Sequence, residues 1–407
     1  MTTLRGGKAP WATLLSALSA CTGNVEDEAV TLTAVDAWTT EAEYEFGDRF
    51  DGDALFGLIV DVAVTPDGSR IYVLDSRATE VTIWTPKGNL IRRFGREGEG
   101  PGEFRNPGRF YLYDDSLVVR EWRRGLTTFS LDGDFIGWHA IPPFVSWRGF
   151  SFSYESLLAD GSFLVTPVVG GMISEGLTGD DPIHEIPWLR VAQETGSWSL
   201  DTVALRSDRN TTIVFPGTGT TVATFFDQPW VRKDACQGDG RVGSVVCART
   251  QTMPPGVVDL VEVSVGGDTV WTRRIQLEPL PIGDREYEEK VDWMASIVSR
   301  DHGGDSVASP LMRRRVREKL ANPGFWPAIR GIRLMSNGEV WFRRLKEGAS
   351  HVWYAARRGE TEGPIRQIVL PENFKPRFVD DTHVWGDRSD ELGVTYVAGR
   401  RLMPTRE

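Results

Sequence analysis

Four arginines stand at matching places in a repeated, β-rich pattern along the chain. Each lies at or just before the first strand of a predicted repeat: Arg109, Arg148, Arg330 and Arg377. If the repeats surround a common axis with their first strands innermost, the four guanidinium groups ring one mouth of a central channel. Planar guanidinium groups bind carboxylate, phosphate and sulfate, so the pattern predicts an anion site. The alternative is that each arginine pairs with an acidic residue of a neighbouring repeat and only holds the ring together.

Sequence motifs of the common catalytic sites are missing. No HExxH, GxSxG, P-loop or EF-hand pattern occurs, and the segment from Phe215 to Thr221 has no lysine to bind phosphate. The five histidines are scattered singly: His139, His184, His302, His351 and His383. Hydrogen-bonded or solvent-exposed histidines are the simplest interpretation, and a metal site assembled from separate repeats is the alternative. We therefore predict no catalytic residue, no metal ligand and no cofactor.

The composition is that of a globular protein with an acidic surface. The chain has 407 residues, of which 40% are hydrophobic and 25% charged, and its net charge is −11. Binding along a nucleic-acid backbone requires a basic surface that releases counterions, so we expect no nucleic-acid partner. We also expect a monomer.

The elements that must position the arginines form a repeated β-meander. Four strands are predicted over 60–64, 71–75, 80–84 and 90–94, with Pro-Asp-Gly and Lys-Gly-Asn turns between them. The same unit recurs over 110–138, and fainter copies give six starts near 60, 109, 148, 221, 330 and 377. Meanders of under fifty residues that bury their faces against one another predict a propeller. Residues 44–46 are available to complete the last blade beside Val394–Ala398 and so close the ring.

These repeats resemble a known family. Val73 to Gly88, followed by Gly95 to Pro107, looks like the NHL repeat, and the whole chain is similar to the six-bladed, TolB-like propeller lipoproteins of bacteria. The similarity is sharpest over 56–138. In the second copy, Arg120-Glu121-Trp122 replaces the aspartate that the repeat has after its second strand. The resemblance implies an all-β, six-bladed β-propeller of four-stranded antiparallel blades. Related propeller lyases and lactonases hold a metal in the channel, but their ligands have no residue-by-residue match here.

The N-terminus carries the pattern of an exported lipoprotein. Arg5 and Lys8 precede a short apolar stretch over 9–18, which is too short to span a bilayer. Leu18-Ser19-Ala20-Cys21 resembles the lipobox of bacterial lipoproteins, in which the cysteine receives the lipid. We predict a signal peptide over 1–20, a lipid-anchored linker over 21–42 and the propeller over 43–407, facing the periplasm or the cell exterior. An ordinary cleaved signal with a chance cysteine is the alternative.

The two remaining cysteines are Cys236 and Cys247. Gly238-Asp239-Gly240 between them favours a turn, so both cysteines can lie on opposing strands of one hairpin. An even pair in an exported protein predicts a disulfide. A metal or redox pair is the alternative, although neither a CxxC spacing nor a nearby histidine supports it.

Two insertions interrupt the repeats. Helical spacing over 284–299 and a Ser309-Pro310 helix start predict a helical hairpin over about 284–322. The first helix is acidic and the second basic, so we expect the two to pair charges; a docking patch for an anionic partner or a lipid headgroup is the alternative. Residues 170–187 are predicted to form a surface loop.

The sequence therefore predicts a lipid-anchored propeller that binds an unknown protein or a small anionic ligand at the channel mouth or at the helical insertion. The competing hypothesis is a metal-dependent enzyme of the lyase or lactonase type that uses the central channel. A third possibility is a purely structural component of the cell envelope whose channel is plugged by side chains. Most of the fifteen tryptophans, such as Trp84, Trp271, Trp341 and Trp353, occur in alternating strand patterns and are expected to pack between blades; stacking of sugar rings on their aromatic faces is the alternative.

Overall fold

The structure is a computed structural model that describes residues 32–47, 55–122, 124–168, 185–207, 212–216, 224–301, 308–344 and 351–405. The predicted signal peptide over 1–20, Cys21 and most of the predicted surface loop over 170–187 lie outside the described residues. His184 and His302 lie outside them as well.

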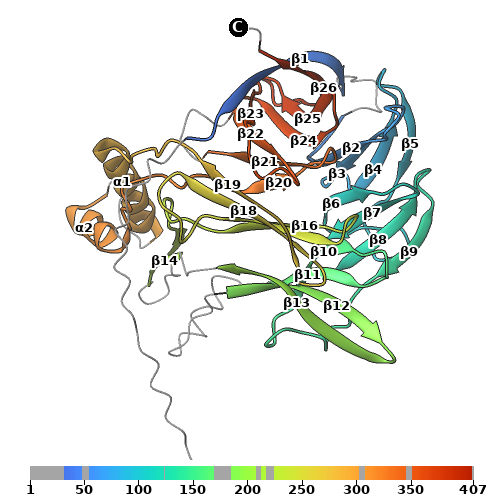
Figure 1. The fold of residues 1–407 in the computed structure, drawn as a ribbon, viewed down its shortest axis with the longest axis horizontal. Helices are drawn as coiled ribbons and strands as arrows, with labels where there is room; N and C mark the ends of the chain where they lie inside the picture. The colour runs from blue at the N-terminus through green and yellow to red at the C-terminus, as the bar shows by residue number, and fades with distance from the viewer. Residues whose placement is uncertain are drawn as a thin grey trace, which may run out of the picture. The chain divides into compact units, whose positions relative to one another are not determined.

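Most strands group into six four-stranded antiparallel blades, which confirms the predicted six-bladed propeller (Figure 1). Blade 1 contains β2 Ile59–Val64, β3 Ile71–Asp75, β4 Glu80–Trp84 and β5 Leu90–Phe94. Blade 2 contains β6 Pro107–Leu112, β7 Ser116–Glu121, β8 Gly125–Ser130 and β9 Phe135–His139. Blade 3 contains β10 Phe152–Leu157, β11 Phe163–Pro167, β12 Glu185–Glu194 and β13 Ser197–Ser207.

The other three blades follow the same order. Blade 4 contains β16 Ala235–Asp239, β17 Ser244–Arg249, β18 Val257–Ser264 and β19 Thr269–Gln276. Blade 5 contains β20 Ile332–Leu334, β21 Glu339–Arg343, β22 Val352–Arg357 and β23 Ile365–Val369. Blade 6 contains β24 Phe374–Val379, β25 His383–Ser389, β26 Thr395–Pro404 and the N-terminal strand β1 Val35–Phe46.

The hydrophobic core consists of the contacts between blades. One apolar cluster lies at each of the six interfaces, including the interface between blade 6 and blade 1, where Trp385 and Val397 pack on Ile59 and Val73. The second strand of blade 1 is buried at every position because both of its faces meet other strands. Trp84, Trp271 and Trp341 are buried in these layers, as predicted. The packing therefore runs around the whole ring.

Strand β1 closes the ring as the sequence predicts. Tyr44, Glu45 and Phe46 pair antiparallel with Gly399, Ala398 and Val397 of β26, and the other edge of β1 pairs in parallel with β23. The strand begins at Val35, so the predicted boundary at residue 43 falls inside it. Residues 35–42, expected in the linker, belong to the propeller because their backbone completes the outer edge of blade 6.

The fourth predicted blade start, near 221, is wrong. Residues 212–227 contain a separate hairpin of β14 Thr212–Phe215 and β15 Thr224–Asp227, and blade 4 begins at Ala235. The disulfide lies in this blade and is confirmed: Cys236 and Cys247 are directly opposite each other on β16 and β17.

The substituted position after the second strand of blade 2 keeps its structural role. In blade 1, the Asp75 carboxylate accepts hydrogen bonds from the backbone N–H groups of Leu58 (2.9 Å) and Arg77 (2.9 Å). In blade 2, Glu121 accepts one from the backbone N–H of Arg105 at 2.9 Å. Both acceptors hold the segment that enters the innermost strand of their blade, so the longer glutamate replaces the aspartate.

The predicted helical hairpin is present as α1 Asp284–Asp301 and α2 Pro310–Lys319. The Ser309 hydroxyl caps α2 by accepting from the Met312 N–H at 3.2 Å. Arg313 pairs with Asp292 at 2.7 Å, and Arg317 pairs with Glu288, which confirms charge pairing between the helices. Neither helix is long and apolar enough to cross a membrane, and the same holds for the rest of the described chain.

Candidate functional site: the central cavity

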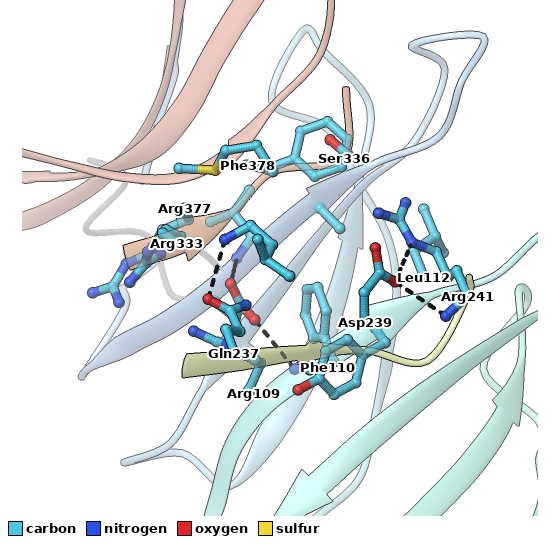
Figure 2. Close-up of a pocket in the computed structure, with 17 residues that line it drawn as sticks. Arg109, Phe110, Leu112, Gln237, Asp239, Arg241, Arg333, Ser336, Arg377 and Phe378 are labelled. Atoms are coloured by element: carbon cyan, nitrogen blue, oxygen red, sulfur yellow. Dashed lines mark hydrogen bonds and ion pairs between the residues drawn. The ribbon is translucent and has the colours of Figure 1, made fainter. Parts of the chain in front are cut away.

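A small polar cavity lies where the innermost strands of the blades meet. Its volume is about 90 Å³, well below the roughly 300–1,000 Å³ of a typical drug-sized ligand site. The strands β2, β6, β16, β20 and β24 line it, so five of the six blades contribute (Figure 2). Its charged or amide-bearing lining residues are Asp61, Arg109, Gln237, Asp239, Arg241, Arg333 and Arg377. We call this space the central cavity.

β-Bulges direct several of these side chains. The registers of β2, β6, β10 and β24 each shift by one residue within the innermost strand. The shifts fall just before Asp61, just before Arg109, at Glu155 and at Arg377. A bulge adds a residue to one strand and turns the neighbouring side chains, so it can bring a charged group to the axis without breaking the apolar alternation elsewhere.

Arg109 and Arg333 face the cavity without a counter-charge in contact. Arg333 donates one hydrogen bond, to the backbone carbonyl of Pro376 at 2.9 Å. In the described part of the chain, no carboxylate lies within 4.0 Å of either guanidinium group. The hydroxyl of the nearby Tyr111 is buried and has no hydrogen-bond partner of normal geometry. These groups leave several donors for a ligand, since each guanidinium carries five N–H bonds.

Arg377 has a structural role as well. Its Nε donates to Asp387 at 2.6 Å, and its terminal nitrogens donate to the carbonyls of Ile59 (3.0 Å) and Val60 (2.9 Å). The two bonds to carbonyls join blade 6 to blade 1, whereas Asp387 lies in the same blade as Arg377. Arg377 thus helps to hold the ring together, but through backbone carbonyls and not through an acidic residue of the neighbouring blade.

The electrostatic surroundings of the cavity arginines differ. Burial lowers the pKa of Arg109, but the nearby Tyr111, Asp61 and Glu155 outweigh it and raise that pKa above its usual value. Burial and the neighbouring Arg109 lower the pKa of Arg333 to about 10, and Arg377 adds to the effect. Burial raises the pKa of Asp61, although Arg109, Arg333 and Arg377 oppose that shift. Asp61 accepts hydrogen bonds from the backbone N–H groups of Val62 and Phe110, both at 3.2 Å. It thus offsets only part of the positive charge.

A wider mouth adjoins the cavity at the ends of the same strands. Its volume is about 380 Å³, and it shares Leu112, Arg241, Ser336 and Phe378 with the central cavity. Figure 2 shows Asp239 and Arg241 apart from the group of Arg109, Arg333 and Arg377. The mouth is also lined by Asp114, Asp380 and Asp381, so it is more acidic than the central cavity.

Two of the four predicted arginines lie elsewhere. Arg148 is exposed and has a positive φ of 48°, and Gly149 follows with 84°. The two form a tight turn between Trp147 and Phe150, outside the strands, and the Arg148 guanidinium lies over the Trp147 ring at 4.9 Å. Arg330 is exposed two residues before β20 and lines a different groove. The structure thus brings together Arg109 and Arg377 and separates Arg148 and Arg330 from them.

Sequence reasoning missed Arg333. The strand β20 is only three residues long, so it gives little alternation from which to assign a face. Arg333 does precede a large apolar residue, Leu334, as Arg109 and Arg377 precede phenylalanines. Arg330 precedes Gly331 instead. That difference is the available signal for choosing between the two arginines.

Metal ligands do not gather in the part of the chain that the structure describes. No group of three or more His, Cys, Asp or Glu side chains there has the geometry to hold a metal ion. His383 lies on β25 and pairs with Glu43 at 3.0 Å, and His139 lies on the outermost strand of blade 2. The metal-dependent alternative therefore gains no support from these residues.

Comparisons with known proteins agree with the fold. Residues 52–155 match the model of the family DUF5128, described as a 6-bladed beta-propeller. No curated protein sequence matches the chain. A candidate exported protein from Bacteroides fragilis is similar in structure, with 10% identity, coverage of 92% of this chain and 100% of that chain, and a TM-score of 0.47.

Two further solved structures are similar at the same low level. A member of the duf4221 family from Bacteroides vulgatus shares 7% identity over 90% of this chain and 98% of that chain, with a TM-score of 0.47. A streptogramin B lyase shares 13% identity over 90% and 98%, with a TM-score of 0.41. These likenesses carry no inference about activity.

Proposed function

We propose that this chain is an exported, lipid-anchored binding module whose central cavity holds an oxyanion group, such as a carboxylate, phosphate or sulfate. The observation that carries the proposal is the convergence of Arg109 and Arg333 on the central cavity, with no carboxylate of the described residues within 4.0 Å of either guanidinium group. Buried charges are normally paired, so two guanidinium groups that lack a paired acid favour an anionic ligand. The small volume suits the oxyanion group itself.

Sulfate tests this proposal because it is a small divalent oxyanion that stays ionised. The thermal midpoint of the intact protein is measured in sodium sulfate and in sodium chloride at equal ionic strength. A ligand that binds only the folded state adds RT ln(1 + [L]/Kd), about 2.7 kcal/mol at 100 times Kd. Sulfate also stabilises proteins generally by exclusion from their surfaces, so the comparison between variants decides the outcome.

The test variant is R109Q/R333Q and the matched control is R148Q/R315Q. Both remove two positive charges, but Arg148 and Arg315 are exposed and outside the cavity. We expect R109Q/R333Q to lose the part of the sulfate response that exceeds general stabilisation, while the control keeps it. Equal responses in the wild type and R109Q/R333Q would overturn the proposal. If that variant does not fold, R109K/R333K keeps both charges and loses the planar fork, and weaker sulfate binding is then expected.

We also propose that Cys21 carries a lipid and that the blades are of the NHL, TolB-like type. The lipobox-like segment before Cys21 and the repeat pattern over 73–107 support this. Labelled palmitate fed to expressing bacteria should enter the wild-type protein and be absent from C21A. Equal labelling of both proteins, or of neither, would refute the lipid anchor without bearing on the anion site.

A further inference from the structure

A second and larger groove lies beside the helical hairpin. Its volume is about 690 Å³, which falls within the range of small-molecule sites. One wall comes from α1 and the others from segments 226–233 and 326–330. We call it the lateral groove, and the residues that line it include Phe226, Lys290, Trp293, Met294, Trp326 and Arg330.

Aromatic and apolar side chains form the body of the lateral groove. The rings of Phe226 and Trp293 meet edge to face with centroids 5.7 Å apart, yet Trp293 remains 51% exposed. Trp326 is held by a hydrogen bond from its Nε1 to Glu286 at 3.2 Å. Met294 and Ile329 are almost fully buried beneath. A ring or alkyl chain can therefore pack against rigid apolar surface here.

The charged side chains known to line the lateral groove are all basic. They are Lys233, Lys290 and Arg330, and none of the described side chains that line it is acidic, in a chain whose net charge is −11. Lys290 Nζ lies 4.5 Å from the centre of the Trp293 ring. Among the residues that the structure describes, no acid lies within 4.0 Å of Lys290 or Arg330.

The cations of α2 that face α1 differ from those that line the lateral groove. On the side of the hairpin where α1 meets α2, Arg313 and Arg317 are neutralised by acids of α1. Toward the lateral groove, Lys290 and Arg330 have no such partner among the described residues, and a further cation, Arg343, lies close to Arg330. The pKa of the neighbouring Arg343 reflects this crowding: burial lowers it most, and the nearby positive charge of Arg330 lowers it further.

We propose that the lateral groove binds a small organic acid with an aromatic or aliphatic body. The body of the ligand lies against Trp293 and Trp326, and its carboxylate meets Lys290 and Arg330. Such a ligand matches both the apolar surface and the positive rim, whereas an inorganic anion would leave the apolar surface in water. The site is independent of the central cavity, which is too small for a fused aromatic ring.

Two probes of the same shape separate charge from apolar contact. Naphthalene-2-carboxylate and naphthalene-2-carboxamide are titrated into the full-length protein by calorimetry. We expect the carboxylate to bind at least about tenfold more tightly, because only it gains charge-assisted hydrogen bonds. In K290Q/R330Q the carboxylate should weaken to the level of the carboxamide, and in W293A both probes should weaken together.

The central-cavity variant R109Q/R333Q serves as the control and should bind both probes as the wild type does. The proposal is overturned if the two probes bind equally to the wild type, if K290Q/R330Q binds the carboxylate unchanged, or if no saturable binding of the carboxylate occurs. Loss of binding in R109Q/R333Q with retention in K290Q/R330Q would move the site to the central cavity and also refute it.

Discussion

Removal of Arg358 should destabilise the contact between blades 4 and 5 more than removal of any exposed arginine. Arg358 follows β22 of blade 5 and reaches three residues of blade 4. It bonds Asp239 at 2.8 Å, Ser244 at 3.0 Å and both carboxylate oxygens of Glu262. Its side chain is 13% exposed, and those of Asp239 and Glu262 are 6% and 8% exposed.

The expected loss of free energy of unfolding follows from the partners that Asp239 and Glu262 keep in R358M. R358M keeps most of the side-chain volume, but Glu262 then retains only the Ser244 hydroxyl at 2.7 Å as a partner. Asp239 keeps a longer contact with Arg241 at 3.4 Å. Breaking a buried ion pair by removing one partner costs about 3–5 kcal/mol, because an uncompensated charge stays buried. We expect a loss of free energy of unfolding in that range at pH 7.

The pH dependence of the loss gives an independent check. Burial raises the pKa values of Asp239 and Glu262, but their cationic partners outweigh it and hold both below their usual values. Each carboxylate thus contributes stability above its usual pKa, and this contribution disappears as the pH falls. Without Arg358, Glu262 takes up a proton at a higher pH. The destabilisation should therefore be largest at neutral pH and shrink toward pH 4.

Urea unfolding of the wild type, R358M and the control R314M measures both effects. Arg314 pairs with Glu318 at 3.0 Å on α2, but the two side chains are 78% and 58% exposed. Its removal should cost less than about 0.5 kcal/mol. The double variant R358M/E262Q should recover part of the loss, because it removes the unpaired charge. A cost for R358M no larger than that for R314M, or one that grows as the pH falls, would refute the reasoning.

Three shorter predictions test other parts of the fold. C236S/C247S should lower the free energy of unfolding by about 3 kcal/mol, the chain-entropy value for a loop this short, as measured by urea unfolding against the oxidised wild type. Deletion of residues 33–46 should open the ring and expose an unpaired strand edge, seen as aggregation in size-exclusion chromatography; a monomer with native circular dichroism would contradict this. S309A should cost about 1 kcal/mol of stability through loss of the α2 cap, and an unchanged thermal midpoint would show that the cap is dispensable.

Much of the fold could be predicted because the sequence repeat is clearest in its first two copies. In blades 1 and 2 the turn residues and the alternating strands give strand positions close to those observed. The pairing of residues 44–46 with the last strand follows from the need to leave no open edge. The disulfide follows from two cysteines on either side of one turn. These predictions depend on local turn chemistry and alternation, which a single sequence carries.

The positions of the cavity arginines depend on bulges and turns that the local sequence pattern does not encode. A bulge shifts side chains by one residue, so alternation alone cannot tell which residue of an innermost strand faces the axis. Arg148 and Arg330 each precede a glycine and then an apolar residue, so the sequence pattern is the same at the tight turn and at the start of β20. Only β20 carries an arginine into the cavity, and that arginine is Arg333. Likewise, the strands of the β14–β15 hairpin are short apolar runs of the kind that a buried blade strand has, and only their pairing shows that they lie outside the blades.

Both candidate binding sites use positions where the chain departs from the regular blade. In the central cavity, Asp61, Arg109 and Arg377 lie at bulges in the innermost strands, whereas Arg333 lies in the short, regularly paired β20; the lateral groove is built from the segments inserted between blades 4 and 5 and around the β14–β15 hairpin. The faces of a regular blade are buried on its neighbours, so a cation there would face an apolar layer unless it lies at the axis or in an insertion. The axis and the insertions are thus the positions where positive charge can accumulate without a paired acid. In a chain of net charge −11, those positions are also where an anionic ligand gains most over solvent.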